Sequence, residues 1–553
     1  MASQQVVNQP PPLESYNLFS TDRALCEGLE REAPGGDVSE VRTVGERAGA
    51  PDVIALGFDA NTNPPELRTH DRFGNRIDEV HYHPAYHVLM AISTGYGLHG
   101  SPWIENIAFQ HVTRAAKFFL MSQVDSGHGC PISMTYAALP ALARNPELSR
   151  VLAPHVGARA YDPRLLPLGE KPGMLFGMGM TEKQGGSDVR ANRTRAVPAS
   201  NARGNGAEYV LDGHKWFCSA PMSDAFLVLA QADGGLSCFY LPRVLPDGSR
   251  NPFFLQRLKS KLGNHSNASS EVEFAGTHAW LLGDEGRGIA TIVDMVNSTR
   301  LDCITGSAGL MRQAVAQAIH HAAYRQTFGR TLVQHPLMQN VLADLALESE
   351  AATALFLRAA RATDDWASGR RDGALRRVGT AIGKFYVCKR APAVVAEALE
   401  CLGGNGYVEE SVMPRLYREA PLNSIWEGSG NINALDVLRI IRKAPEAIDA
   451  LRTEIAPALG DRHMLAAAND LERDLGSEDD REWQARSLVE RMALLWQAAL
   501  LVQHAPNYVA DAFIESRIAG KWGRAMGTLM NKRAFRGIIE RAAPQEYEVP
   551  IIQ

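Results

Sequence analysis

The hydrophobic residues of this chain repeat with a helical period, then with a strand period, and then with a helical period again. Up to about Pro172 the apolar positions have the spacing of amphipathic helices, as over residues 107–124. From about Gly173 to Gly283 they form short runs, and beyond Gly286 the helical repeats return. This order predicts three successive parts: a helical region, a small β domain and a helical bundle.

The β segment is expected to be antiparallel. Its runs of β-branched and aromatic residues lie at 209–211, 226–229, 237–241 and 271–274. Gly and Asp residues at 212–213, 233–235 and 247–248 are predicted to turn the chain between them at hairpin-like intervals.

The length of 553 residues exceeds what a single core fills, so we divide the sequence into four segments. Residues 1–172 are an N-terminal arm and helical domain, 173–285 the β domain, 286–443 the helical bundle, and 444–553 an extra C-terminal helical domain. The predicted fold class is mainly α with a central antiparallel β domain.

The composition is that of an ordinary globular protein. Hydrophobic residues make up 45% of the chain, and no apolar run approaches the roughly 20 residues that cross a bilayer. The N-terminus has no signal-peptide pattern, so a cytoplasmic location is expected. Seven scattered cysteines without a CxxC pair predict reduced thiols rather than disulfides or a zinc site, and we expect no metal.

One carboxylate stands out as a candidate base. Glu427 lies between Trp426 and Gly428, directly before a predicted helix at 434–442. Desolvation by Ile425 and Trp426 would raise its pKa toward neutral pH, and Gly428 would let a ligand approach the backbone. On these residues alone, a surface Glu in a turn is the simpler interpretation.

Four further motifs precede this one. They are residues 180–188 (MTEKQGGSD), 213–219 (GHKWFCS), 325–329 (RQTFG) and 403–407 (GGNGY). In this order they resemble the acyl-CoA dehydrogenase superfamily. Less general stretches at residues 63–67 (NPPEL), 130–135 (CPISMT) and 261–268 (KLGNHSNA) resemble, within it, the AidB family, the flavoproteins of the bacterial adaptive response to DNA alkylation. The resemblance runs from about Asn17 to about Lys443 and implies that fold, with FAD as the cofactor.

The resemblance also implies the chemistry. Desaturation of an acyl thioester needs a base for the α proton while a β hydride leaves for the flavin, and Glu427 matches that base. The Glu427 backbone N–H and a flavin hydroxyl would hold the thioester oxygen, and Arg300 would line the same cavity. Some relatives carry their base on an earlier helix. Here Ser298 and Thr299 precede Arg300, so no carboxylate stands directly before that arginine and Glu427 keeps the usual position of the base.

The flavin contacts follow from the same resemblance. Phe217 would cover the ring face and Ser219 would bond near its reactive nitrogen. For Phe217 taken alone core packing is the better interpretation, but within the ordered set of motifs flavin contact is favoured. Arg325 would reach the pyrophosphate of a flavin bound mainly to a neighbouring subunit, which implies a homotetramer. The other implied contacts are Met180, Thr181, Gly186, Ser187, Phe328, Gly403, Gly404, Gly406, Ile425, Trp426, Gly428, Ser429 and Asn431.

Double-stranded DNA is the second candidate partner. The net charge of −5 means that DNA binding would need a local basic patch. Arg517, Lys521 and Arg524 are spaced to share one helix face, and Arg439 and Arg442 lie where the bundle leads into the last segment. Composition alone favours a solvated charged face. The resemblance favours backbone contacts with duplex DNA, weakly sequence-selective and salt-sensitive.

Two hypotheses follow. The first is a FAD-containing protein of the adaptive response that binds duplex DNA, limits alkylation damage, and keeps a weak isovaleryl-CoA-type dehydrogenase site. The second is an ordinary metabolic acyl-CoA dehydrogenase whose extra domain supports assembly. The chain has no GxGxxG after a strand, no Walker loop, no HExxH and no GxSxG, which argues against Rossmann dehydrogenases, ATPases and zinc or serine hydrolases. The sequence predicts no membrane association.

Overall fold

A computed structural model describes residues 5–371, 373–476 and 481–547 of the chain. It divides into two compact units, each assembled from segments that are distant in sequence. The β unit contains residues 55–110 and 124–299, and the helical unit contains residues 1–54, 111–123 and 300–553. These units cut across the predicted segments, because residues 1–172 contribute to both and the last segment shares a unit with the bundle.

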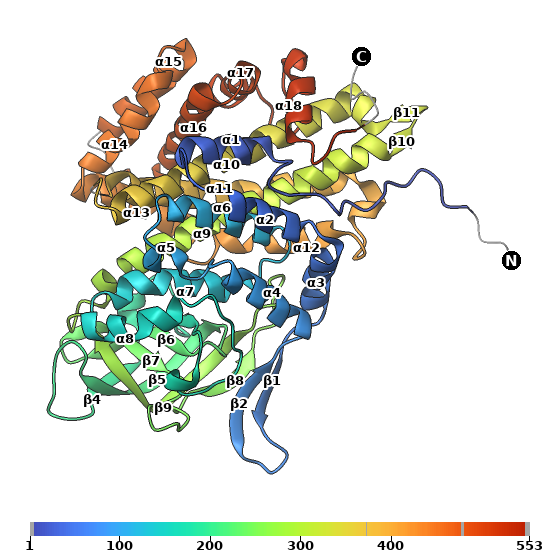
Figure 1. Ribbon diagram of the computed structural model, residues 1–553. Helices are drawn as coiled ribbons and strands as arrows, with labels where there is room; N and C mark the ends of the chain where they lie inside the picture. The colour runs from blue at the N-terminus through green and yellow to red at the C-terminus, as the bar shows by residue number, and fades with distance from the viewer. Residues whose placement is uncertain (1–4, 372, 477–480, 548–553) are drawn as a thin grey trace. The chain divides into compact units, whose positions relative to one another are not determined.

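The β unit is built around a seven-stranded sheet (Figure 1). The strands are β3 (Phe176–Gly179), β4 (Arg195–Pro198), β5 (Glu208–Ser219), β6 (Ala225–Ala232), β7 (Gly235–Pro242), β8 (Phe254–Leu258) and β9 (Ser269–Leu282). Six of them have the order β3-β6-β4-β5-β9-β7, and β8 pairs with β9 beside this path. Because β6 also pairs with β7, the sheet closes on itself. Most pairs are antiparallel, as predicted, but β3 and β4 run parallel to β6.

Strand β6 shows why both faces of this sheet are buried. Its side chains alternate between two apolar clusters, with Phe226 and Val228 in one and Leu227 and Leu229 in the other. The second cluster also takes residues of α7 (Gly129–Leu142) and α8 (Pro146–Val156). A continuous apolar run is therefore the sequence signature of this strand.

The turn predicted at residues 212–213 is wrong. Asp212 and Gly213 lie inside β5, where the register against β9 shifts between Leu211 and Gly213. Gly213 has a φ of 151°, and a Cβ there would lie 2.6 Å from the Cα of Thr194. The glycine therefore allows a bulge and a close approach of two backbone segments, and the strand continues beyond it.

The remaining elements of the β unit are short. They are the hairpin β1 (Glu66–His70) and β2 (Arg76–His81), and the helices α4 (Pro84–Gly95) and α5 (Ser101–Ile104). Helix α3 (Pro51–Thr62) lies at the point where the chain enters this unit.

The helical unit contains most of the helices. They are α1 (Arg23–Glu32), α2 (Ser39–Ala48), α6 (Gln110–Ser122), α9 (Gly288–Tyr324, from Arg300 on), α10 (Pro336–Ala367), α11 (Ala374–Cys401), α12 (Val412–Glu419), α13 (Gly430–Lys443), α14 (Glu446–Ile455), α15 (Arg462–Gly476), α16 (Ala485–His504), α17 (Asn507–Phe513) and α18 (Phe535–Ala542). A small hairpin, β10 (Gln326–Thr327) and β11 (Arg330–Thr331), follows α9. The predicted long helices are all present.

The C-terminal helices complete the core of this unit. Helix α16 packs against both α10 and α11, and its Trp496 is fully buried. A Cβ at Gly379 of α11 would lie 2.7 Å from the Trp496 ring, so the glycine admits this indole. Residues 444–476 and 481–547 thus share a packed core with the bundle.

Among the described residues, no helix is long and apolar enough to cross a membrane. All seven cysteines are free thiols, and six of them are buried.

Candidate active site

The backbone at Glu427 has an unusual conformation. Glu427 has a φ of 55° and Gly428 a φ of 93°, so two consecutive residues are left-handed. For glycine this is free of strain, but for a glutamate it costs about 1–2 kcal/mol. Such strain persists only where surrounding contacts enforce it, and it is found most often at functional sites.

Three donors hold the carbonyl groups of this turn. Arg300 Nε lies 3.2 Å from the carbonyl oxygen of Glu427. The oxygen of Gly428 accepts from Lys384 Nζ at 2.9 Å and from Asn433 Nδ2 at 2.6 Å. These side chains come from α9, α11 and α13, so three helices fix one turn.

The donors are buried, and burial strengthens their hydrogen bonds to the carbonyl oxygens. The Lys384 side chain is among the largest fully buried ones, and Arg300 is buried with its guanidinium 2.6 Å from Asp436. A charged donor in a low-dielectric surrounding binds a carbonyl oxygen more strongly than a neutral one. The resemblance implied that Arg300 lines the same cavity as Glu427, and the structure places its guanidinium at the Glu427 carbonyl.

Sequence reasoning missed Lys384, Asn433 and Asp436. The only signal for Lys384 was a lysine within the apolar stretch Ala381-Ile382-Gly383 and Phe385-Tyr386 of a helix. Asn433 and Asp436 lie on α13, outside the glycine-rich motif.

The buried thiol of Cys303 interacts electrostatically with Lys384 and Glu427. Burial raises the pKa of Cys303 well above its usual range; Lys384 opposes this shift, and Cys388 and Glu427 add to it. Cys303 is therefore a neutral thiol at physiological pH and does not compete with Glu427 as a base.

The aromatic and apolar neighbours of Glu427 behave differently from one another. Trp426 is anchored because its Nε1 donates to Asn423 Oδ1 at 2.8 Å. Ile425 is 63% exposed within this chain, whereas Glu427 is half-buried. Ser429 and Asn431 are also exposed, and Asn431 Oδ1 accepts from Arg486 at 3.3 Å.

In the β unit, the predicted flavin-contacting residues follow β3. Asn192 Nδ2 donates to the Met180 carbonyl, and Trp216 N donates to the Thr181 carbonyl, both at 2.9 Å. Gly186 lies against Thr181 Oγ1, and a Cβ there would be only 2.5 Å from that oxygen. Ser187 is exposed.

Glu182 fixes the loop that follows β3 through its buried carboxylate. Its carboxylate accepts from Lys215 Nζ at 2.9 Å and from the backbone N–H groups of Arg193 and Thr194. Burial opposes its ionisation, but the Lys215 ammonium and these donors outweigh burial and hold the pKa of Glu182 below its usual range. The loop after β3 is thereby fixed to β5.

Two residues near the end of β5 face outward. Phe217 is 52% exposed, although it is an aromatic residue in a strand, and Lys259 Nζ lies 4.7 Å from its ring centroid. Ser219 Oγ lies 3.4 Å from Ser269 Oγ. The core packing considered for Phe217 is therefore absent.

The remaining predicted contacts lie in the β10–β11 region and in a short 3-10 helix, Gly403–Gly406, of the helical unit. Phe328 has a φ of 50° and is 97% exposed at the β10–β11 turn. Arg325 donates to the carbonyl of Asn8 at 2.7 Å. At Gly403 and Gly404 a Cβ would meet nothing within 4 Å, whereas at Gly406 it would clash with the Leu399 carbonyl.

The predicted DNA-binding helix face does not form. Arg517 lies in a π-helical turn, Ile514–Ile518, and the helix ends there because Gly520 is left-handed, with a φ of 72°. Arg517 is buried, and its guanidinium contacts Asp344 and Glu348 of α10. Arg517 is therefore unavailable to a surface ligand, and that prediction is wrong.

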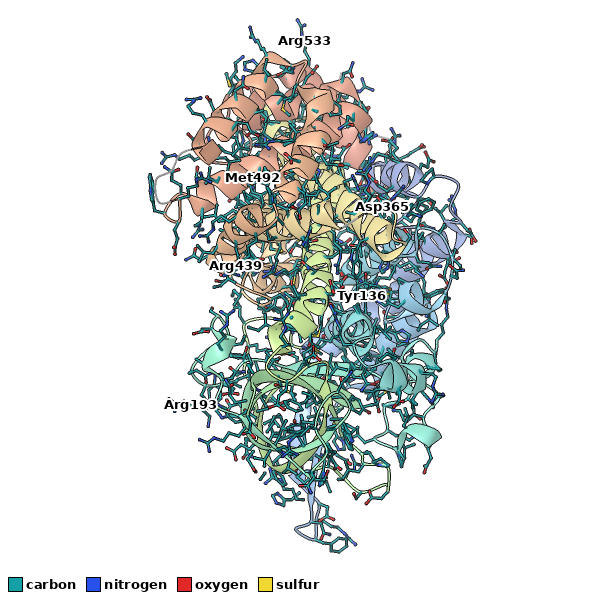
Figure 2. All side chains as sticks on the ribbon, turned by 90° about the vertical axis from the view of Figure 1, so that its left-hand side faces the viewer. Tyr136, Arg193, Asp365, Arg439, Met492 and Arg533 are labelled. Atoms are coloured by element: carbon teal, nitrogen blue, oxygen red, sulfur yellow. The ribbon has the colours of Figure 1, made fainter. Side chains whose placement is uncertain are left out.

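The other predicted cations are exposed. Arg439 lies 2.9 Å from Asp436 and Lys521 lies 3.2 Å from Glu515, while Arg442 and Arg524 are also at the surface. Figure 2 shows Arg533 projecting from the outer end of the C-terminal helices.

Family models match most of the chain. The Adaptive response protein AidB N-terminal domain matches residues 8–163, the acyl-CoA dehydrogenase middle domain residues 177–277, and the acyl-CoA dehydrogenase C-terminal domain residues 286–441.

Individual proteins agree with these matches. The putative acyl-CoA dehydrogenase AidB of Escherichia coli is 46% identical over 94% of this chain and 95% of its own length. Isovaleryl-CoA dehydrogenase of Oryza sativa is 27% identical over 66% of this chain and 86% of its own. Caenorhabditis elegans ACDH-11, solved with C11-CoA, superposes with a TM-score of 0.82 at 26% identity over 100% and 94% of the two chains. An acyl-CoA dehydrogenase of Bacillus anthracis, solved with FAD, shares the fold with a TM-score of 0.68 at 18% identity over 94% of each chain.

Proposed function

Because the chain belongs to the acyl-CoA dehydrogenase family and, within it, to the AidB group of FAD-dependent oxidoreductases, we propose that it desaturates a short branched acyl-CoA of the isovaleryl type with Glu427 as the base. The observation that supports this role is the strained turn at Glu427, which buried Arg300 and Lys384 hold by its carbonyl oxygens.

Taken separately, each unit carries residues that fit contact with a flavin. The β unit offers the exposed Phe217 ring, the Ser219 hydroxyl and the narrow glycine loop at Gly186. The helical unit offers Arg325, Phe328 and the open glycines Gly403 and Gly404. An exposed aromatic ring and glycines without neighbours have no packing role within the chain, which supports ligand contact.

In the proposed reaction, Glu427 removes the α proton of the thioester and keeps it on its carboxyl group. The α carbon–hydrogen bond and the β carbon–hydrogen bond break, and a carbon–carbon double bond forms between the two carbons. FAD, when bound, supplies the acceptor for the β hydride. Because Arg300, Lys384 and Asn433 hold the carbonyls of residues 427 and 428, the backbone that carries the Glu427 side chain keeps a fixed position during proton transfer.

The exposed loops support assembly into a homotetramer. Phe328 is almost fully exposed at a hairpin tip, and burial against another copy would remove this apolar surface from water. We propose that Arg325 and the glycines at 403–406 contact a flavin bound mainly to a neighbouring copy.

Anaerobic titration tests the reaction. The purified protein should be yellow, and isovaleryl-CoA should bleach the flavin band, whereas free isovalerate should not. A protein that binds FAD but is bleached by no acyl-CoA would contradict the proposed activity. A protein that takes up no FAD would contradict the whole site.

Duplex DNA is the second proposed ligand. The similarity to AidB of E. coli and the exposed cations Arg439, Arg442, Lys521 and Arg524 support it. Arg439 and Lys521 are offset by nearby carboxylates, so Arg442 and Arg524 carry the proposal. By binding the backbone, the protein would limit alkylation damage, either by shielding the DNA or by deactivating the alkylating agent.

A salt series with a random-sequence duplex tests this proposal. The slope of log affinity against log salt is negative, and each lost phosphate contact makes it less steep by about 0.9, so the double variant Arg442→Gln/Arg524→Gln should make it less steep by about 2. Arg68→Gln, an exposed change in the β unit, is the matched control. No duplex binding by the parent would favour an ordinary dehydrogenase with an extra assembly segment.

A further inference from the structure

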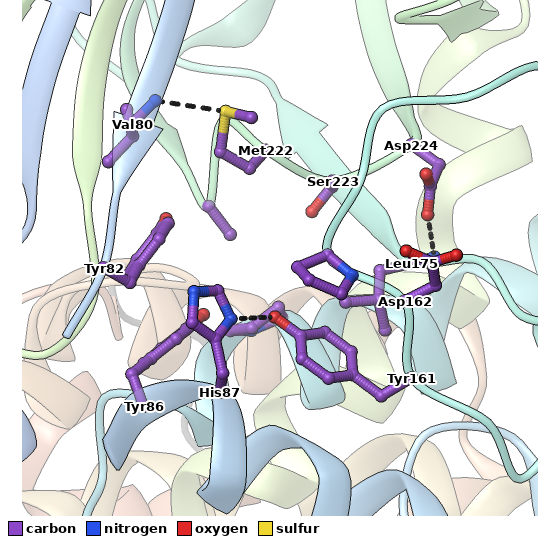
Figure 3. Close-up of a pocket in the computed structure, with 13 residues that line it drawn as sticks. Val80, Tyr82, Tyr86, His87, Tyr161, Asp162, Leu175, Met222, Ser223 and Asp224 are labelled. Atoms are coloured by element: carbon purple, nitrogen blue, oxygen red, sulfur yellow. Dashed lines mark hydrogen bonds between the residues drawn. The ribbon is translucent and has the colours of Figure 1, made fainter. Parts of the chain in front are cut away.

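The β unit contains a pocket that shares no residue with the proposed flavin contacts. It has a volume of about 430 Å³ including its open mouth (Figure 3). Its walls come from β2 and α4, from residues 161–163, and from the β5–β6 connection at residues 220–224. These segments, together with Pro131 of α7 and Leu175 directly before β3, converge on one space.

One side of the pocket is aromatic. Tyr82 and Tyr86 stack with ring centroids 4.2 Å apart and an interplanar angle of 14°. His87 and Tyr161 form a second pair, in which the Tyr161 hydroxyl lies 2.7 Å from His87 Nδ1. Such walls favour a flat apolar ligand.

The charges around the pocket are already matched. The Asp224 carboxylate lies 3.0 Å from Lys171 Nζ and accepts from Leu175 N at 2.8 Å. Asp162 lies 2.6 Å from Arg164, whose hydrogen bonds lower the pKa of Asp162 to about 2. Burial lowers the pKa of His87, so this imidazole is neutral at physiological pH. No net charge is left for an ionic ligand.

One polar group is left without a partner. Ser223 is 3% exposed, and its Oγ makes no hydrogen bond to any residue that the structure describes. Figure 3 shows this hydroxyl pointing into the pocket. An unsatisfied buried hydroxyl costs about 1–3 kcal/mol, and a ligand oxygen would remove that cost.

We propose that this pocket is a second binding site, which takes an uncharged single-ring aromatic molecule whose carbonyl oxygen accepts a hydrogen bond from Ser223. The stacked tyrosines contact the ring, and the matched carboxylates exclude anions and give cations no free partner. The site requires neither the flavin nor Glu427.

Three probes of almost the same shape test the proposal. Benzamide is neutral, benzoate is an anion and benzamidine is a cation at pH 7.5. Titration of the flavin-loaded protein, followed by saturation-transfer NMR, should show benzamide bound and both ions at least tenfold weaker. Equal binding of either ion, or no binding of benzamide at millimolar concentration, would overturn the proposal.

Variants localise the binding. Ser223→Ala should weaken benzamide about 3- to 10-fold, the range of a single hydrogen bond. Ser200→Ala, an exposed serine of the same unit, should leave it unchanged. Unaltered binding in a folded Ser223→Ala protein contradicts the assigned contact. Displacement of benzamide by isovaleryl-CoA would assign the pocket to the substrate and overturn its independence.

Discussion

Two buried arginines of the helical unit, Arg300 and Arg517, do different work. Arg300 pairs with Asp436 and donates to the carbonyl of Glu427, a residue in a strained turn. Arg517 contacts two carboxylates of α10, Asp344 and Glu348, and joins the end of α17 to that helix. The first arginine positions a candidate catalytic residue, whereas the second stabilises helix packing. The sequence pattern predicted Arg517 on a basic surface, whereas in the fold its charge is buried against two carboxylates.

The largest expected effect is on stability, at Arg517. In Arg517→Met, Asp344 and Glu348 lose a buried guanidinium, and we expect the free energy of unfolding to fall by about 3–5 kcal/mol. Urea denaturation followed by circular dichroism measures this loss. Arg524→Met, an exposed change a few residues later, should stay within about 0.5 kcal/mol of the parent. If the two variants lost the same free energy of unfolding, Arg517 would contribute no more to stability than the exposed Arg524, which would contradict its buried ion pairs.

The next effect is on catalysis, at Lys384. Lys384→Met removes a charged donor from the Gly428 carbonyl, so the backbone turn that carries Glu427 is held less firmly. We expect kcat to fall about 10- to 100-fold while flavin content is retained. Arg377→Met, on the outer side of the same helix, is the control, and Lys384→Arg should recover part of the rate. A change in KM alone would contradict a positioning role.

The smallest effect concerns the strain itself. Glycine accepts a left-handed φ freely and alanine does not, so Glu427→Gly should be about 1–2 kcal/mol more stable than Glu427→Ala. Both variants remove the carboxylate, so the difference isolates the backbone. Thermal unfolding of the two proteins side by side measures it. Identical stabilities would mean that residue 427 is not left-handed in solution.

Much of this fold could be predicted from local sequence patterns. The long helices and the runs of β6, β7 and β9 were predicted from their periods, and Glu427 from its motif. The Gly213 bulge was missed because it depends on pairing with β9, which is distant in sequence. Lys384 was missed because a single lysine in an apolar helix has no periodic signal. Gly520 did carry the stop signal that breaks the predicted basic face, and it could have been used.

The interleaving of the two units could not be predicted from sequence patterns. Residues 111–123 form a helix whose partners belong to the bundle, since the backbone N–H groups of His111 and Val112 donate to Asp364 of α10. Such long-range pairing leaves no trace in local periodicity.

The most direct test of Glu427 as the base is rapid anaerobic mixing of Glu427→Gln with isovaleryl-CoA. Glutamine keeps the size of the side chain but cannot accept the proton, so the flavin should stay bound and oxidised while its reduction slows about 100- to 10,000-fold. Flavin reduction as fast as in the parent would contradict the role of Glu427 as the base.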